Sequence, residues 1–375
     1  MALRFFTLVL LMPLIFTPTP LAAIDVELIE TVPIRLEFER IEKVGGFFVT
    51  DDGLVVVSDE WAGDLKVMER SGEHLKLLRI IGERGYGPGE FISPYNCNYE
   101  KKSRRFVVAD WGAKKIFLYN RVGRTGFERD DVEVPCPHGA FDLQLKANTL
   151  YVAGHRILED QRRYALYSVD LGQVGRNGSS SRASEKFLVS SKKMYQMDDY
   201  PNFTIQYSDQ FIPVIGMNHY FDIHNEDAYI VWMGDLKIIK LGIESDQKSR
   251  KVFGKKTGNY VKPYPSRRLI DSYRSGNRDL YLEELKNMSL VWKVIAASRH
   301  VLLIYEGPEL FTEENKSNFW LQFYTMDGTF KGEKQLAGKP SRRLYFDRGN
   351  NTLYSISGDL AGGELSLLKY RIVEQ

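Results

Sequence analysis

The sequence contains few cysteines, no excess of one charge and only one notable apolar run. Cys97 and Cys136 are the only cysteines in 375 residues, so at most one disulfide can form within the chain. The 51 Lys and Arg residues nearly balance the 49 Asp and Glu residues, which gives no bulk attraction to nucleic acid or to an anionic membrane surface. No stretch reaches the about 20 apolar residues of a membrane-spanning helix. We therefore expect neither a nucleic-acid partner nor a membrane span.

The N-terminus has the pattern of a secretory signal peptide. Arg4 precedes a short apolar run, Phe5–Phe16, and small residues lead to Ala23. A basic start, a short apolar core and a small-residue exit are typical of such signals. We expect cleavage after Ala23, which would remove residues 1–23 and leave a secreted or periplasmic protein. A buried N-terminal segment is the alternative.

Aromatic residues make up 13% of the chain, and they favour strands. Short apolar runs recur between strand-like neighbours. They are LVVVSDEW (54–61), RFVVADWG (105–112), TLYVAGHR (149–156), AYIVWMGD (228–235), HVLLIYEG (300–307) and TLYSISGD (352–359). Most of the intervals suit the roughly 40–50 residues of a four-stranded propeller blade. Two longer intervals require insertions, at about 191–217 and 255–288, which could cover one face of the ring or only decorate the packing.

The strand pattern predicts an all-β fold, a single six-bladed β-propeller over residues 24–375. The sixth unit ends after its third strand, and a spare strand, Ile34–Ile41, precedes the first unit. Joining the two would complete the last blade and remove two open sheet edges. An open β-sandwich array with a separate domain is the alternative. In the second insertion, Asp279 is expected to cap a short helix.

The glycine-rich stretch GYGPGEFISP (85–94) lies between two strand patterns. A phosphate-binding loop would need Lys-Ser or Lys-Thr and then a helix after its glycines, whereas Glu90 and Phe91 follow here and no helical pattern does. We therefore interpret the stretch as a sharp connection between blades. With the following FVVAD (106–110), it resembles the NHL repeat of six-bladed propellers, and VVVSD (55–59) resembles the second half of that repeat. The whole chain resembles the broader NHL-like or TolB-like group, and we interpret Asp59 and Asp110 as structural.

The first strands of the blades should line a central channel, and their starts should meet at one mouth. The polar residues expected there are Asn96, His138, Asp142, His219, Asp222 and Arg342, with Tyr95 and Arg343 beside two of them. Such a set suits a polar ligand. We expect a monomeric binding module without a cofactor, whose partner is a protein, a peptide or a carbohydrate.

An enzyme is the alternative, and the sequence leaves the choice open. The resemblance implies that a hydrolase or lyase of this group, such as a lactonase, would hold a divalent ion in the channel. Asn96, Asn98 and Asp222 are the nearest counterparts of a lactonase calcium set, without a clear Glu. The histidine pattern of the lyases is absent.

Cys97 and Cys136 lie near the starts of first strands in neighbouring units. A disulfide between them is therefore a candidate, and export would allow it. Two buried thiols are the alternative.

Overall fold

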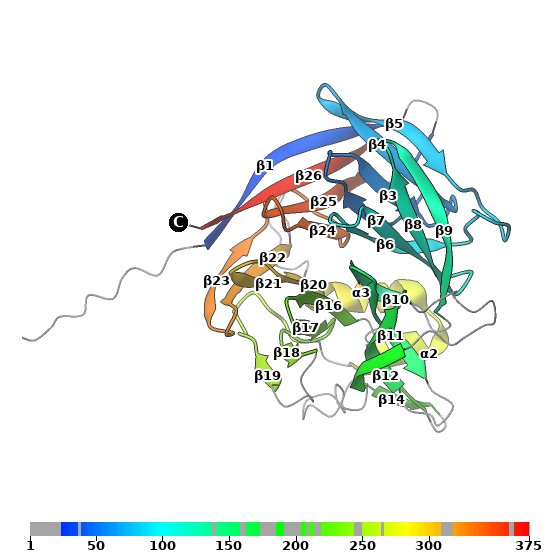
Figure 1. The fold of residues 1–375 in the computed structure, drawn as a ribbon. Helices are drawn as coiled ribbons and strands as arrows, with labels where there is room; N and C mark the ends of the chain where they lie inside the picture. Colours follow the sequence, from blue (N-terminus) through cyan, green and yellow to red (C-terminus); the bar gives the residue numbers. More distant parts are fainter. Residues whose placement is uncertain are drawn as a thin grey trace, which may run out of the picture.

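The computed structural model describes residues 24–36, 39–136, 140–157, 163–172, 185–190, 204–207, 210–213, 219–243, 250–263, 266–308, 318–359 and 364–374. Within these ranges the chain forms β-strands and two short helices (Figure 1). The strands make one eight-stranded sheet, four four-stranded sheets and a two-stranded hairpin. The predicted predominance of β-structure is confirmed.

The eight-stranded sheet has the order β2-β3-β4-β5-β1-β26-β25-β24. Its strands are β1 (Ile24–Arg35), β2 (Val44–Val49), β3 (Val55–Asp59), β4 (Asp64–Ser71), β5 (His74–Ile81), β24 (Leu344–Asp347), β25 (Thr352–Asp359) and β26 (Glu364–Glu374). It therefore combines the two ends of the chain.

The four-stranded sheets follow the chain in order, with antiparallel neighbours. They are β6 (Pro94–Glu100), β7 (Arg105–Asp110), β8 (Lys115–Val122) and β9 (Gly126–Pro135); β10 (Ala140–Lys146), β11 (Thr149–Ile157), β12 (Arg163–Asp170) and β13 (Glu185–Ser190); β16 (His219–His224), β17 (Asp227–Trp232), β18 (Ile238–Gly242) and β19 (Arg250–Phe253); and β20 (Leu290–Ala296), β21 (His300–Glu306), β22 (Phe319–Thr325) and β23 (Phe330–Gln335).

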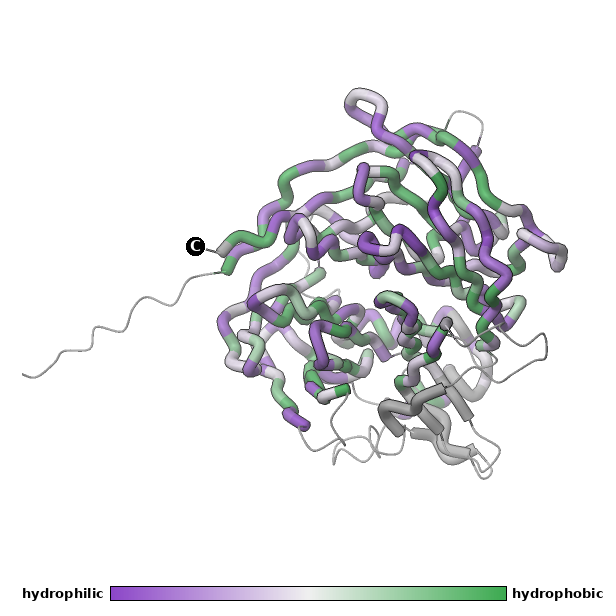
Figure 2. The backbone as a smooth tube through the Cα atoms, viewed as in Figure 1, coloured by the Kyte–Doolittle hydropathy of each residue, from purple (hydrophilic) through white to green (hydrophobic). Residues whose placement is uncertain are grey.

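The first strands of the predicted units are β2, β6, β10, β16, β20 and β24, and each apolar run is the strand that follows. Strands β24, β2, β6, β10, β16 and β20 contact one another in succession. Hydrophobic and hydrophilic residues alternate along many strands (Figure 2), as half-buried strands require. The largest hydrophobic cluster joins the first two units to β25 and β26, so the core lies between neighbouring sheets.

The N-terminal strand β1 pairs antiparallel with the C-terminal strand β26, from Ile24 opposite Glu374 to Ile34 opposite Leu365 (Figure 1). Pairing between the chain ends was predicted, but the segment Ile34–Ile41 was wrong, because the strand begins at Ile24 and ends at Arg35. The missing N–H of Pro33 is tolerated because only one side of β1 is paired there.

The glycine-rich stretch connects β5 to β6, and no helix follows it. Gly82 and Gly89 have φ of +76° and +86°, which is why glycine is needed at these bends. Phe91 is fully buried, with its ring centroid 5.8 Å from that of Phe117. The connection therefore anchors one sheet to the next, as the sequence predicted.

Asp110 accepts hydrogen bonds from the backbone N–H groups of Ile92, Ser93 and Ala113, at 2.7, 3.0 and 2.9 Å. Asp59 accepts equivalent bonds from the segment before β2. Each carboxylate therefore ties the end of a second strand to the backbone that leads into the first strand. The predicted structural role of both residues is confirmed.

Two longer connections precede β16 and β20. The first contains the hairpin β14 (Thr204–Tyr207) and β15 (Gln210–Pro213), and the second contains α2 (Arg267–Ser275) and α3 (Arg278–Lys286). The side chain of Asn277, not Asp279, caps α3 by accepting a hydrogen bond from the backbone N–H of Leu280. In the described part of the chain, neither helix has the length and apolarity needed to cross a bilayer.

Candidate functional site

A cavity of about 80 Å³ lies where the first strands converge, with lining residues on or next to all six of them. These strands run from a common mouth inward. Side chains near their starts therefore surround the mouth, and side chains further along form the wall.

The wall is made of polar side chains that bond to the backbone of the next first strand. The Nδ2 of Asn96 donates to the carbonyl of Phe141 at 3.0 Å, and the Oδ1 of Asn98 accepts from the N–H of Leu145 at 3.0 Å. The two bonds satisfy a backbone carbonyl and a backbone N–H on the edge of β10. No described strand pairs with that edge, so these two groups would otherwise have no strand partner.

The same arrangement continues around the cavity. Gln144 makes two bonds to Ile223, accepting from its N–H at 2.6 Å and donating to its carbonyl at 3.1 Å. Asp222 accepts from the N–H of Ala296 at 2.6 Å. We use the term polar wall for Asn96, Asn98, Asp142, Gln144 and Asp222.

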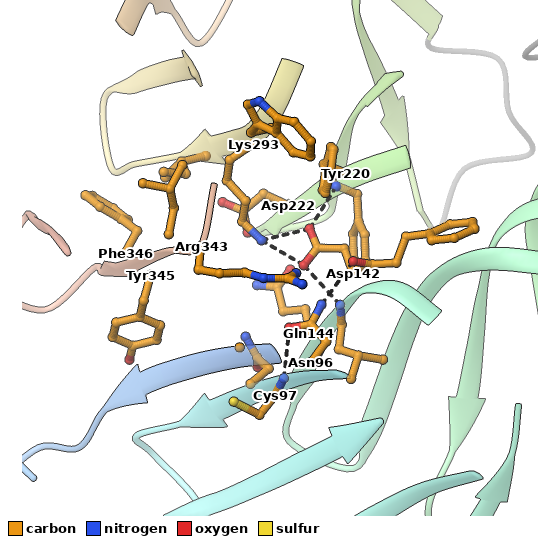
Figure 3. Close-up of a pocket in the computed structure, with 18 of the residues that line it drawn as sticks. Asn96, Cys97, Asp142, Gln144, Tyr220, Asp222, Lys293, Arg343, Tyr345 and Phe346 are labelled. Carbon is orange, nitrogen blue, oxygen red and sulfur yellow. Dashed lines mark hydrogen bonds and ion pairs between the residues drawn. The ribbon is translucent and has the colours of Figure 1, made fainter. Parts of the chain in front are cut away.

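Asp142 forms the most buried ion pair of the cavity. Both of its oxygens lie 2.7 Å from the Nζ of Lys293, and they also accept from the N–H groups of Leu143 and Phe221. Burial raises the pKa of the Asp142 carboxyl, while the Lys293 ammonium and the backbone donors oppose that rise. The bidentate contact joins β10 to β20 across the cavity (Figure 3).

Asp222 forms a second ion pair, with Arg348. Arg348 follows β24, and its Nε also donates to the carbonyl of Ala296 at 3.4 Å. Because Ala296 is the last residue of β20, this contact lies at the end of the cavity away from the mouth. Both wall carboxylates are therefore engaged by cations.

Aromatic rings surround the mouth in two groups. The ring centroid of Trp111 lies 5.5 Å from that of Tyr95 and 6.1 Å from that of Phe141. The centroids of Tyr220 and Trp292 are 6.2 Å apart. We call these five residues the aromatic rim; its most exposed member, Trp111, is 47% exposed.

Two arginines lie beside the aromatic rim, and they differ in their contact partners. The guanidinium of Arg342 lies 4.5 Å from the ring centroid of Trp292, and its Nε is 2.8 Å from an oxygen of Glu306. The guanidinium of Arg343 lies 4.6 Å from the ring centroid of Tyr95. Its Nε donates to the backbone carbonyl of Val44 at 3.2 Å, and the described residues provide no carboxylate for it.

Of the six residues that the sequence placed at the mouth, Asn96, Asp142, Asp222 and Arg342 line this cavity. His219 is fully buried at the start of β16 and is not among the lining residues. His138 lies outside the described residues.

Sequence reasoning placed Tyr95 and Arg343 at the mouth but missed Lys293 and the rest of the aromatic rim. A signal for Lys293 was present, because it is the single charged residue in the apolar strand LVWKVIA. For the rim, the aromatic residues at the strand starts resembled ordinary core positions.

Cys97 and Cys136 are two buried thiols, which was the alternative to a disulfide between them. Cys97 lies on the first strand β6, whereas the N–H of Cys136 bonds to Lys114 just beyond the fourth strand, β9. The two are therefore separated by the width of a sheet, about 14 Å for three strand spacings. Both are buried and no disulfide joins them; burial raises the pKa of the Cys97 thiol to about 12.

Among the described residues, no group of three or more His, Cys, Asp or Glu side chains is arranged to hold a metal ion. Asn96 and Asn98, expected as calcium ligands under the enzyme alternative, instead bond to the backbone of β10.

No protein-family profile matches the sequence, and no curated protein does. Among solved structures, a member of the DUF4221 family from Bacteroides vulgatus superposes with a TM-score of 0.63 and 14% identity, over 94% of this chain and 99% of that one. A candidate exported protein from Bacteroides fragilis superposes with a TM-score of 0.55 and 13% identity, over 95% and 98%. At these identities the likeness shows a shared fold.

Proposed function

We propose that this chain is an exported, monomeric, six-bladed β-propeller that binds a ligand at the aromatic rim above the central cavity. The partner belongs to one of three classes: a protein, a peptide or a carbohydrate. The site, the blade number and the export each have their own support.

The blade number follows from dividing the eight-stranded sheet between β5 and β1. These two strands share only two paired positions, Ile34 with Leu75 and Arg35 with Lys76, and they run parallel. Blades of four antiparallel strands then arise at each end of the chain, and the four other sheets bring the number to six. The glycine lead and the Asp59 and Asp110 bonds support a relationship to the NHL-like or TolB-like group.

Export is supported by the predicted signal peptide over residues 1–23. The neighbour from Bacteroides fragilis is itself described as a candidate exported protein. We propose a secreted or periplasmic location for this chain on these grounds.

The binding site is carried by one observation, the aromatic rim and its two arginines above a polar cavity. Trp111 is 47% exposed and Trp292 is partly buried, so both offer apolar surface next to hydrogen-bonding groups. A pocket that combines aromatic walls with a few fixed polar groups is typical of ligand sites. The connections that contain β14–β15 and α2–α3 lead into β16 and β20, and so they end at this same mouth.

Screening the purified protein against arrays of glycans, peptides and proteins tests the proposal. We expect bound ligands, and we expect Trp111→Ala and Trp292→Ala to weaken their binding by about tenfold or more, because aromatic anchors dominate such sites. Trp61→Ala is the matched control. Trp61 is 56% exposed in the corresponding β3–β4 turn and its ring lies against Lys43, whereas the ring of Trp111 lies against Phe141, which lines the cavity. An array without hits, or equal losses in all three variants, would remove the proposal.

The enzyme alternative gains no specific support from the site. Asp142 and Asp222 are the carboxylates that line the cavity, and each is already paired with a cation. We therefore do not place a hydrolase or lyase reaction there.

A further inference from the structure

The ion pairs of the cavity leave one positive charge without a carboxylate. Lys293 is paired with Asp142, Arg348 with Asp222, and Arg342 with Glu306 just outside the lining. Among the described residues, Arg343 is the lining cation for which no carboxylate partner is recorded. The site therefore carries a net positive charge where a ligand would enter.

Arg343 is held in place before any ligand arrives. Its Nε is bonded to the carbonyl of Val44, and its guanidinium lies against the ring of Tyr95. The side chain extends from β24 toward Asp142 and Lys293 (Figure 3). A guanidinium with a fixed orientation presents a fork of N–H donors that matches a carboxylate, and less rotamer entropy is lost on binding.

A second donor comes from another first strand, β20. The ammonium of Lys293 has three protons, and its two hydrogen bonds both go to Asp142. One proton of Lys293 is therefore left for a ligand. Together, Arg343 and Lys293 provide donors from two directions, as recognition of an anionic group requires.

The position of the charged groups separates the anionic end of a ligand from the rest. Arg343 and Lys293 line the cavity, whereas Trp111 lies outside its lining, so a carboxylate fits inside while a larger body stays at the mouth. There the ring of Trp111 is 47% exposed and offers an apolar surface that suits the C–H face of a sugar ring, while the Arg342 guanidinium covers one face of Trp292.

An extended peptide fits this site less well. Peptides that add to a sheet need unpaired backbone groups on a strand edge. At the cavity, Asn98 and Gln144 already bond to the backbone of β10 and β16. Recognition here therefore depends on side chains, which suits a compact ring with one charged substituent.

We propose that the site binds an acidic saccharide, with the carboxylate of a uronic acid at Arg343 and Lys293 and the sugar ring against the aromatic rim. This inference rests on the proposed binding function and specifies its ligand. It depends on Arg343 in particular, whereas the binding function as such depends on the rim.

Methyl glucuronide and methyl glucoside, titrated separately and followed by NMR, test the inference because they differ only in the carboxylate. We expect the glucuronide to bind, the glucoside to bind about tenfold or more weaker, and added salt to reduce this difference. Arg343→Gln should abolish the preference, and Arg343→Lys should keep part of it, since lysine retains the charge but not the fork.

Arg124→Gln is the matched control, because Arg124 is 73% exposed in the β8–β9 turn, away from the mouth. If Arg343→Gln fails to fold, the comparison of the two sugars with the unaltered protein decides alone. Three results would overturn the inference: no binding of the glucuronide, equal binding of both sugars, or an unchanged preference in Arg343→Gln.

The proposed binding function fails separately from this inference. Array ligands that need Trp111 but are neutral sugars or peptides would leave the binding function standing and remove the acidic saccharide. An array without ligands would remove both.

Discussion

The wall and the mouth of the cavity are built from similar strands. Their side chains differ in how far they are already bonded to other groups of the protein. In the wall, Asn98 and Gln144 are hydrogen-bonded to the backbone of a neighbouring strand. At the mouth, Trp111 is half exposed, and no carboxylate in the described ranges pairs with Arg343. Polar residues in such a cavity are therefore weak indicators of a ligand until their bonds are known.

The difference has a simple physical cause. Each first strand has one edge that is not paired within its own sheet, because its other edge already pairs with the second strand. Buried backbone groups on that edge need partners, and the wall side chains provide them. At the mouth, outside the starts of the strands, water can provide hydrogen-bond partners for the backbone. Side chains at the mouth are therefore available for other contacts.

The largest effect is expected from the ion pair in the wall. Asp142→Ala should lower the free energy of unfolding by about 3 kcal/mol, because it leaves the Lys293 ammonium partly buried without its carboxylate. Urea unfolding measures this change. The double variant Asp142→Ala/Lys293→Met should recover part of the loss, since it also removes the charge. A loss below about 1 kcal/mol in the single variant would mean that the pair is not structural and that the contrast with the mouth is overstated.

Gln144→Leu tests the wall without involving charge. It keeps a side chain of similar size but leaves the N–H and the carbonyl of Ile223 without partners, which should cost about 1–3 kcal/mol. The measurement is again urea unfolding, accompanied by glycan binding. Unchanged stability would show that water replaces the Gln144 bonds. A loss of binding without a loss of stability would move Gln144 from the wall to the ligand site.

Much of the fold was predictable because its signals are local. Alternating strands and the glycines near Phe91 placed the first strands and their connections correctly. The closing strand was misplaced because Ile34–Ile41 has a strand-like pattern, and nothing local shows that the paired strand begins at Ile24 and ends at Arg35. The choice between a disulfide and two thiols stayed open because the sequence does not show that Cys136 ends one sheet instead of starting the next.

The site was predictable only in outline. Asn96, Asp142 and Asp222 could be placed together because repeated units bring equivalent positions to one axis. The pairing of Asp142 with Lys293, 151 residues apart, could not be seen in one sequence. For the same reason, nothing indicated that Arg343 would lack a carboxylate while Arg342 has one.

The smallest effect is expected at the inner end of the wall, where His224 ends β16. Burial lowers the pKa of His224 below its ordinary 6.5, and the charge of Arg348 adds to this, although Asp222 and Asp227 oppose it and Lys146 reinforces it. As the pH falls below 6.5, the unfolded chain binds the proton more readily than the folded one, so stability should decrease and then level off below the lowered pKa. His224→Gln should flatten that part of the curve. Thermal unfolding of both proteins between pH 5 and pH 7 measures the difference, which isolates His224 from the other histidines. Parallel curves would show that solvent reaches His224 equally in both states, and that the buried character of the wall ends before this residue.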